Sequence, residues 1–404
     1  MVFTVVKTKE PVMTKSLKPR ALYLWSLASA VFYLSLALGS GGAAAQNLSG
    51  SNLRSLLKLG TNNILIADQF NNRVIEVDPN THQIVWQFGT GSDKPGPNSV
   101  VGVNDAERVG PYTLIAGTGI PAASPALPGC STPATGCPDN RVILVNRAGS
   151  IVWQYGDAGV AGSGFNQLDT PVCASIFLGF QRRFGPHVLI TDQGNQRVIV
   201  VDRSRRIVWQ YGTTGMGGNG PNQLNDPNSA QLLDNGNILI ADEGNNRVIE
   251  ITPEFQLVQQ LTAGGTLNGA AFASRLSNGN TLITDANNNR VVEVNPSDAV
   301  VWEYATNTMA GSNANPAPTR ALRLKNGNTL ISDQFNNRVI EVNPGKQIVF
   351  QQGQLNMAGS GANQLNGPYD AKKIGDFTGL TRPIEVQNVI RNNRSTALAP
   401  TAGP

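Results

Sequence analysis

The chain has 404 residues, with 31 Lys and Arg, 27 Asp and Glu, two His, three Cys, 43 Gly and 24 Pro. Hydrophobic residues make up 40% of it, which is enough for a sizeable core and excludes an intrinsically disordered protein. Residues 1–45 hold five of the basic and one of the acidic residues, so residues 46–404 carry 26 of each and are formally neutral. A nucleic-acid-binding protein concentrates Lys and Arg, so this balance argues against a nucleic-acid partner.

Residues 1–45 have the three parts of a secretory signal peptide. A basic stretch ends at Arg20, an apolar run extends over residues 21–38, and three alanines at 43–45 precede Gln46. We therefore predict cleavage after residue 45 and a secreted or periplasmic mature protein without a membrane span. The apolar run is near the shortest length that crosses a bilayer, so an uncleaved membrane anchor is the alternative.

One motif recurs along the rest of the chain. In its most regular copies it reads Gly-Asn-x-Leu-Ile-x-Asp-x-x-Asn-Asn-Arg-Val-Ile-Glu-Val. Five clear copies occupy residues 63–77, 187–201, 237–251, 280–294 and 328–342. A sixth, degraded copy runs from residue 113 to residue 145 and is interrupted by a loop that contains two cysteines. Each copy is followed by a second short apolar run, such as Ile-Val-Trp-Gln at 84–87.

The copies predict short strands rather than helices, because β-branched runs alternate with Asn, Asp and Gly turns. With one more apolar stretch ahead of each copy, the unit has four strands, named a to d, which matches a propeller blade. We predict an all-β, six-bladed β-propeller of four-stranded antiparallel blades, with seven blades as the alternative. The expected blades are residues 50–90, 98–156, 168–213, 225–263, 268–306 and 316–353. They form one domain at 46–390, and a disordered tail follows at 391–404.

A ring has to pair its two ends, because an open blade edge invites aggregation. Residues 367–374 resemble a strand a that follows the sixth blade, and residues 384–390 are another strand candidate. We therefore expect part of 367–390 to pack beside blade one.

The copies resemble the NHL-repeat family of β-propellers over most of residues 50–353, and are less similar to arylsulfotransferase and quinoprotein-type repeats. The resemblance implies a ring with a central channel but fixes no activity, because such propellers serve as enzymes, binding modules and sensors. The amidating lyases of the family use three zinc-binding histidines, whereas this chain has only His82 and His187. Zinc chemistry and histidine-based sulfuryl transfer are therefore not expected.

An Asp and an Arg five positions later recur in the b–c turn of the five clear copies. They are Asp68 with Arg73, Asp192 with Arg197, Asp242 with Arg247, Asp285 with Arg290, and Asp333 with Arg338. We predict a structural role, in which each Asp accepts backbone N–H bonds in the turn and pairs with its Arg. A carboxylate ring around a metal ion is the alternative.

The cysteines fit an exported protein. Cys130 and Cys137 lie in a loop rich in Pro, Gly and Thr, which predicts a local disulfide in an oxidising compartment. Two thiols without a nearby histidine make a poor zinc site, so no metal site is predicted. Cys173 lies in an apolar stretch and is expected to be buried.

In a propeller, the b–c turns and the d–a links share one face, which we call the b–c/d–a face. Phe70 and Phe335 occupy the same turn position in blades one and six, which are neighbours in a closed ring. The two rings either cover the closure seam or form a stacking platform for a sugar or peptide. In the second case the flanking amides of Asn71, Asn72, Asn336 and Asn337 would bind the ligand.

The leading hypothesis is therefore a monomeric binding or interaction module that recognises a carbohydrate, peptide or protein on the b–c/d–a face, without a cofactor. The alternative is a channel-mouth enzyme of the calcium-dependent lactonase or lyase type. Calcium would need acidic or amide ligands that break the repeat, and candidates are Glu243, Asn287, Asp105 and Glu107. No such set is compelling in the sequence, so a binding module is favoured over an enzyme.

Overall fold

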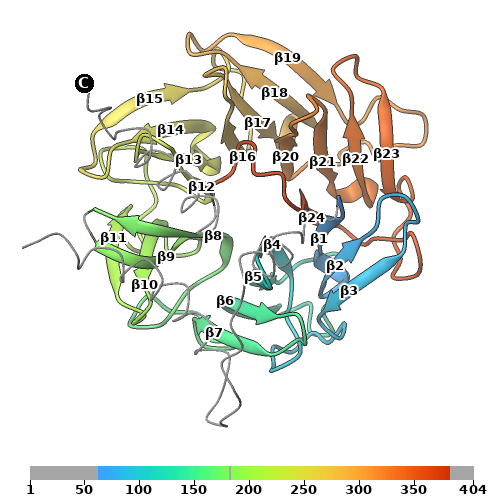
Figure 1. Ribbon diagram of the computed structural model, residues 1–404, viewed down its shortest axis with the longest axis horizontal. Coiled ribbons are helices and arrows are strands. Elements are labelled where there is room, and N and C mark those ends of the chain that lie inside the picture. Colours follow the sequence, from blue (N-terminus) through green and yellow to red (C-terminus); the bar gives the residue numbers. More distant parts are fainter. Residues whose placement is uncertain (1–61, 182, 383–404) are drawn as a thin grey trace, which may run out of the picture. The chain divides into compact units, whose positions relative to one another are not determined.

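Six four-stranded antiparallel sheets stand in a ring around a central axis in the computed structural model, which describes residues 62–181 and 183–382 (Figure 1). This is the predicted six-bladed β-propeller. A seventh blade is wrong for the described residues, because their 24 strands fill six sheets. Four predictions lie outside the described residues. They are the signal peptide at 1–45, the start of blade one at 50–61, the strand candidate at 384–390 and the disordered tail at 391–404.

Each blade begins with strand a at the axis and continues outward to strand d. Blade one consists of β24 (Pro368–Lys373), β1 (Ile64–Asp68), β2 (Arg73–Val77) and β3 (Ile84–Phe88). Blade two consists of β4 (Val103–Val109), β5 (Tyr112–Ile120), β6 (Cys137–Asn146) and β7 (Ile151–Tyr155). Blade three consists of β8 (Pro171–Phe180), β9 (Arg183–Asp192), β10 (Arg197–Asp202) and β11 (Ile207–Tyr211).

The other three blades follow in the same order. Blade four consists of β12 (Pro227–Leu232), β13 (Ile238–Asp242), β14 (Arg247–Ile251) and β15 (Leu257–Leu261). Blade five consists of β16 (Ala270–Arg275), β17 (Thr281–Asp285), β18 (Arg290–Val294) and β19 (Val300–Ala305). Blade six consists of β20 (Arg320–Arg323), β21 (Thr329–Asp333), β22 (Arg338–Val342) and β23 (Ile348–Gly353).

The repeated motif builds each b–c turn. In blade four, a 3-10 turn η2 (Glu243–Asn245) is followed by Asn246 at φ 52°, a left-handed conformation that Asn tolerates better than most residues. One oxygen of Asp242 accepts from Arg247 Nε at 2.7 Å and from Asn245 Nδ2 at 2.8 Å. The other oxygen accepts from the backbone N–H of Asn225 in the d–a link at 2.7 Å. The carboxylate thus connects the turn, the strand and the link, in the way that the predicted structural role requires.

Similar turns are η1 (Gln69–Asn71), η3 (Ala286–Asn288) and η4 (Gln334–Asn336) in blades one, five and six. The degraded copy in blade two lacks the turn Asp, because Gly117 stands in its place. Asp139 replaces it from strand β6 and pairs with Arg141, while the Val101 N–H donates to it at 2.7 Å. A Cβ on Gly117 would lie 2.7 Å from the carboxyl carbon of Asp139, so this glycine makes room for the substitute.

The core lies between neighbouring blades, where apolar side chains of facing sheets interlock. Ile199 and Val201 of blade three pack with Leu114 and Ala116 of blade two, for example. The tryptophans of the outer strands belong to these layers, and Trp209 is buried between blades three and four. Among the described residues, no helix is long and apolar enough to cross a membrane.

The ring closes through strand β24. It pairs antiparallel with β1, with Ile66 opposite Ala371 and Ile64 opposite Lys373. The expectation that part of 367–390 packs beside blade one is confirmed for residues 368–373. The expected boundary of blade one changes accordingly, because its innermost strand comes from this distant segment.

Candidate functional site

The seam half of the b–c/d–a face is covered by apolar packing. The rings of Phe70 and Phe335 stack with their centroids 6.3 Å apart, as the circular geometry predicts. Phe70 is only 6% exposed and lies against Val101, Ile120 and Cys137, while Phe335 is half-buried. The burial of the Phe70 ring favours the seam-covering alternative over the stacking platform.

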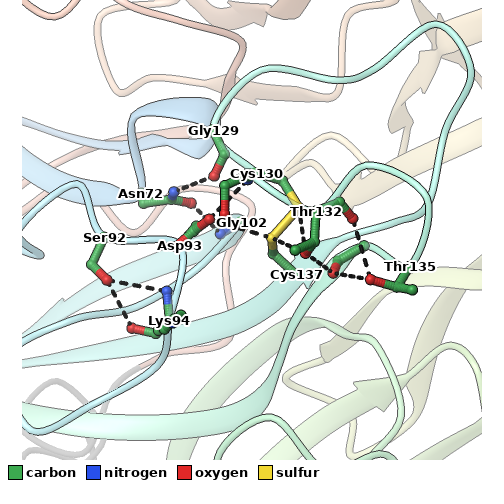
Figure 2. Close-up of a disulfide and its surroundings, with 12 residues drawn as sticks. Asn72, Ser92, Asp93, Lys94, Gly102, Gly129, Cys130, Thr132, Thr135 and Cys137 are labelled. Carbon is green, nitrogen blue, oxygen red and sulfur yellow. Dashed lines mark hydrogen bonds between the residues drawn. A yellow bond between two sulfur atoms is a disulfide. The ribbon is translucent and has the colours of Figure 1, made fainter.

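The flanking asparagines are occupied inside the fold. Asn72 is buried, donates to the carbonyl of Gly129 at 2.7 Å and accepts from the N–H of Gly102 at 2.9 Å (Figure 2). Asn336 is buried and donates to the carbonyl of Thr306, and Asn337 accepts from the N–H of Gly367. Asn71 donates to Asp68 and to the carbonyl of Gly359. Ligand binding by these six residues stays an untested prediction.

The disulfide between Cys130 and Cys137 is confirmed, with their Cα atoms 5.6 Å apart (Figure 2). It staples the loop that covers the seam, since Cys137 and Cys130 contact the cluster around Phe70. Asp93, from the link that enters blade two, accepts the N–H of Ser131 at 2.8 Å and holds the loop from outside. Free Cys173 is buried as expected, and burial raises the pKa of its thiol to about 12.

We expect the double substitution Phe70→Ala and Phe335→Ala to lower the free energy of unfolding by more than about 2 kcal/mol, because it empties a packed cluster. Chemical denaturation of the variant and the parent protein measures the difference. A variant of unchanged stability that loses binding of a ligand would instead support the stacking platform.

Charged side chains fill the channel between the inner strands. Lys372 on β24 forms ion pairs with Asp105 on β4 and, at 2.6 Å, with Asp370 two residues away. Arg320 on β20 is 1% exposed, donates to the carbonyl of Val172 at 2.9 Å, and has its Nε 4.0 Å from Asp370. Because these residues come from blades one, two and six, the charges fasten the inner strands to one another.

The charges in the channel shift one another's pKa values. Burial alone would raise the pKa of Asp105, but Lys372 and Arg320 outweigh burial and hold it below its usual value. Burial raises the pKa of Asp370 to about 6, with Asp105 adding to the rise. Burial opposes the charge of Lys372, yet the two carboxylates raise its pKa above the ordinary lysine value. Asp105, one of the calcium candidates, thus forms an ion pair with Lys372.

The residue that directly follows the repeated Asp differs between blades. It is Gln in blades one and six, at the seam, but not in blades four and five. On the seam side, Gln334 donates to Gln69 at 2.7 Å and Gln69 donates to Asn104 at 2.8 Å, and all three side chains are buried. In blades four and five the same position holds Glu243 and Ala286. At this position the repeat is therefore broken in two neighbouring blades, by a carboxylate in blade four and by a short methyl side chain in blade five.

Beside these two departures the face is hollowed by a pocket of about 470 Å³. It is lined by residues of b–c turns and d–a links in blades three to five: Gln193, Asp226, Glu243, Gly244, Asn246, Asn268, Gly269 and Asn287. Its volume falls within the range of about 300–1,000 Å³ that is usual for small-molecule sites.

Glu243 is the most distinctive group of this pocket. Its Oε2 accepts from Asn228 Nδ2 at 2.6 Å, and the same nitrogen lies 2.8 Å from the hydroxyl of Tyr369. The Oδ1 atom of Asn228 accepts from Arg320 at 3.3 Å. Burial raises the pKa of Glu243, and burial together with the charge of Glu243 raises the pKa of Tyr369 to about 12.

The sequence-based candidates are thus only partly brought together. Glu243 and Asn287 line one pocket, whereas Asp105 and Glu107 are buried on β4. Within residues 62–181 and 183–382, no group of three or more His, Cys, Asp or Glu side chains is arranged to hold a metal ion. Sequence reasoning missed Asn228, Arg320 and Tyr369, because they lie in inner strands whose copies share no motif.

The two histidines take no part in this site. His187 is buried, stacks on Phe177 and has its Nδ1 3.0 Å from the carbonyl oxygen of Gly185. His82 stacks on Phe350, and its Nδ1 lies 2.9 Å from the side-chain oxygen of Gln352. Both have packing roles.

No protein-family model matches the chain, and no curated protein is similar to it. A protein of unknown function from Bacteroides caccae is 15% identical, with 72% of this chain and 92% of that chain covered and a TM-score of 0.46. A streptogramin B lyase is 13% identical, with 72% and 80% covered and a TM-score of 0.45. BamB from Moraxella catarrhalis is 15% identical, with 70% of each chain covered and a TM-score of 0.35. Membership of the NHL-repeat family stays a prediction.

Proposed function

We propose that this chain is an exported β-propeller binding module that holds a carbohydrate, peptide or protein ligand in the pocket on blades three to five. The observation that carries the proposal is the pocket itself, which opens where the repeat is broken at Glu243 and Ala286. Amide and carboxylate groups from three blades converge there, as in sites that fix a ligand through a few placed polar groups.

A pocket-filling variant tests this proposal. Asn287 occupies the turn position that holds Phe70 and Phe335 in other blades, so the turn accepts a phenylalanine there. We expect exported protein to retain ligands from arrays of immobilised glycans and peptides, and Asn287→Phe to lose them at least about tenfold. Ser297→Phe, which adds the same ring to the exposed c–d turn of the same blade, should bind like the parent. Equal binding by Asn287→Phe would refute the site.

A channel-mouth enzyme of the lactonase or lyase type is the second candidate, and the carboxyl of Glu243 favours it. A raised carboxyl pKa beside a pocket is typical of general acid–base groups. Mass spectrometry of ligands incubated with the protein should show turnover that Glu243→Gln stops. If the ligands are recovered intact, the enzyme alternative is wrong and the binding module is the function that remains. Elemental analysis of the exported protein tests whether calcium is bound.

Export itself rests on the leader and on the disulfide, which forms in oxidising compartments. We expect N-terminal sequencing of the exported protein to begin at Gln46, because the three alanines before it fit the cleavage rule. Protein that is recovered from membranes and still contains residues 21–38 would establish the anchored alternative.

A further inference from the structure

The pocket on blades three to five is negatively charged. Asp226 and Glu243 are carboxylates, and none of the other lining residues is a cation. The arginines of the same turns are engaged: Arg247 pairs with Asp242, and Arg290 pairs with Asp285 and with Glu303. A ligand that brings a positive charge would therefore find two carboxylates without competing for an arginine.

Glu243 is held in one orientation by residues from three blades. Asn228, which is 2% exposed, donates to Oε2 and is itself fixed by Arg320 and Tyr369. No donor among the described residues contacts the second oxygen, Oε1. Burial raises the pKa of Glu243 and Asp226 adds to the rise, while the hydrogen bond from Asn228 and the charge of Arg320 offset only part of it. A bound cation would stabilise the ionised carboxylate of Glu243 and so offset the effect of burial.

The rest of the lining is suited to hydroxyl groups. Gln193, Asn246, Asn268 and Asn287 carry amide groups, which combine a donor with an acceptor. Some of these groups are already used inside the pocket, since Asn287 donates to Asn268 at 3.3 Å and Gln193 donates to the carbonyl of Asp226 at 3.4 Å. Asn246 Oδ1 accepts the N–H of Gly269 at 2.7 Å. This bond fixes the Asn246 side chain and uses its oxygen, so the amide nitrogen is the group that Asn246 can offer to a ligand. No lining side chain is apolar or aromatic, so the long stem of a lysine finds no apolar wall and a neutral sugar finds no ring to stack on.

We infer that this pocket binds an amino sugar, with its free ammonium group between Asp226 and Glu243 and its hydroxyl groups on the surrounding amides. The inference rests on the proposed function and names the ligand class of the same site. A charge-assisted hydrogen bond to a carboxylate is about twice as strong as a neutral one, so the ammonium group should dominate selectivity.

Calorimetric titration at about pH 6.5, where such an amine is protonated, tests the inference. The probes are the β-1,4-linked glucosamine trimer, its fully N-acetylated form, and the peptide Gly-Lys-Gly with blocked ends. We expect the glucosamine trimer to bind at least about tenfold more tightly than either other probe. Glu243→Gln and Asp226→Asn should each weaken it by about tenfold.

Glu254→Gln is the matched control, because it makes the same change on the exposed c–d turn of blade four and should leave binding unchanged. Thermal melting checks that each variant is folded. Failure of the glucosamine trimer to bind, equal affinity for the acetylated trimer, or equal effects of Glu243→Gln and Glu254→Gln would overturn the inference. Preference for the lysine peptide or the acetylated trimer, lost in Asn287→Phe, would overturn it while supporting the proposed function.

Discussion

Truncation of the chain after residue 355 should unfold the whole ring rather than shorten it. The cut removes β24 and leaves the inner edge of β1 without its partner. It also removes Leu365 and Ala371 from the core between blades one and six, and leaves Asp105 buried without Lys372. We expect no cooperative unfolding transition, or one whose free energy is lower by more than about 5 kcal/mol.

Truncation after residue 382 is the control, because it keeps β24 and the hydrogen bond from the N–H of Leu232 to Thr381. That variant should unfold with a midpoint close to the parent's in urea, followed by tryptophan fluorescence. If the cut at 355 also left the midpoint unchanged, the segment would be an extension and ring closure through β24 would be wrong.

Lys372→Met should be the most damaging single substitution in the channel. Methionine keeps most of the volume but removes the cation that stands between Asp105 and Asp370. Removing one partner of a buried ion pair costs about 3–5 kcal/mol, because the remaining charge is buried without compensation. Chemical denaturation at neutral pH measures the loss.

Lys373→Met is the matched control on the same strand. Lys373 is half-buried with Glu341 3.7 Å away, so its loss should cost less than about 1 kcal/mol. Adding Asp105→Asn to Lys372→Met should recover much of the stability, since Asp370 then keeps Arg320 as its partner and no second carboxylate is left without a cation. Equal stability of the two lysine variants would show that the channel charges contribute little.

The effect of Lys372→Met should also depend on pH. Burial already raises the pKa of Asp370, and without the lysine we expect it to raise that of Asp105 as well, so the folded variant should bind more protons than the unfolded chain. Its stability therefore rises as the pH falls toward the unfolded pKa near 4, and falls as the pH rises through the folded values. We expect the deficit relative to the parent to be smaller at pH 5 than at pH 8.

The fold could be predicted because the features that build a blade are local. The αL position of Asn246, the Asp242–Arg247 pair and the apolar strand between turns recur within a short stretch of each copy. Closure was also predictable, because a ring must pair its ends and residues 367–374 look like a strand. The lysine of that strand could not be assigned a role, since its partner Asp105 lies in another blade and strands a share no motif.

The candidate site could be predicted only where it departs from the repeat. Glu243 stands out in sequence because three other copies have Gln at its position, and the structure places it in a pocket. Phe70 stood out as an aromatic residue in a polar turn, but its burial depends on the cysteine loop of blade two. Asn228 gave no signal, because an asparagine in an apolar strand becomes meaningful only when its neighbours across the channel are known.

The pairing of Ile64 with Lys373 has a consequence for how the protein is made. The first blade lacks its inner strand until residues 368–373 have left the ribosome, so the closed ring cannot form before that point of synthesis. Pairings between such distant segments also form slowly, on a scale of milliseconds to seconds. For the export proposed above this order of events is favourable, because the ring closes only once residues 368–373 have passed through a translocation channel.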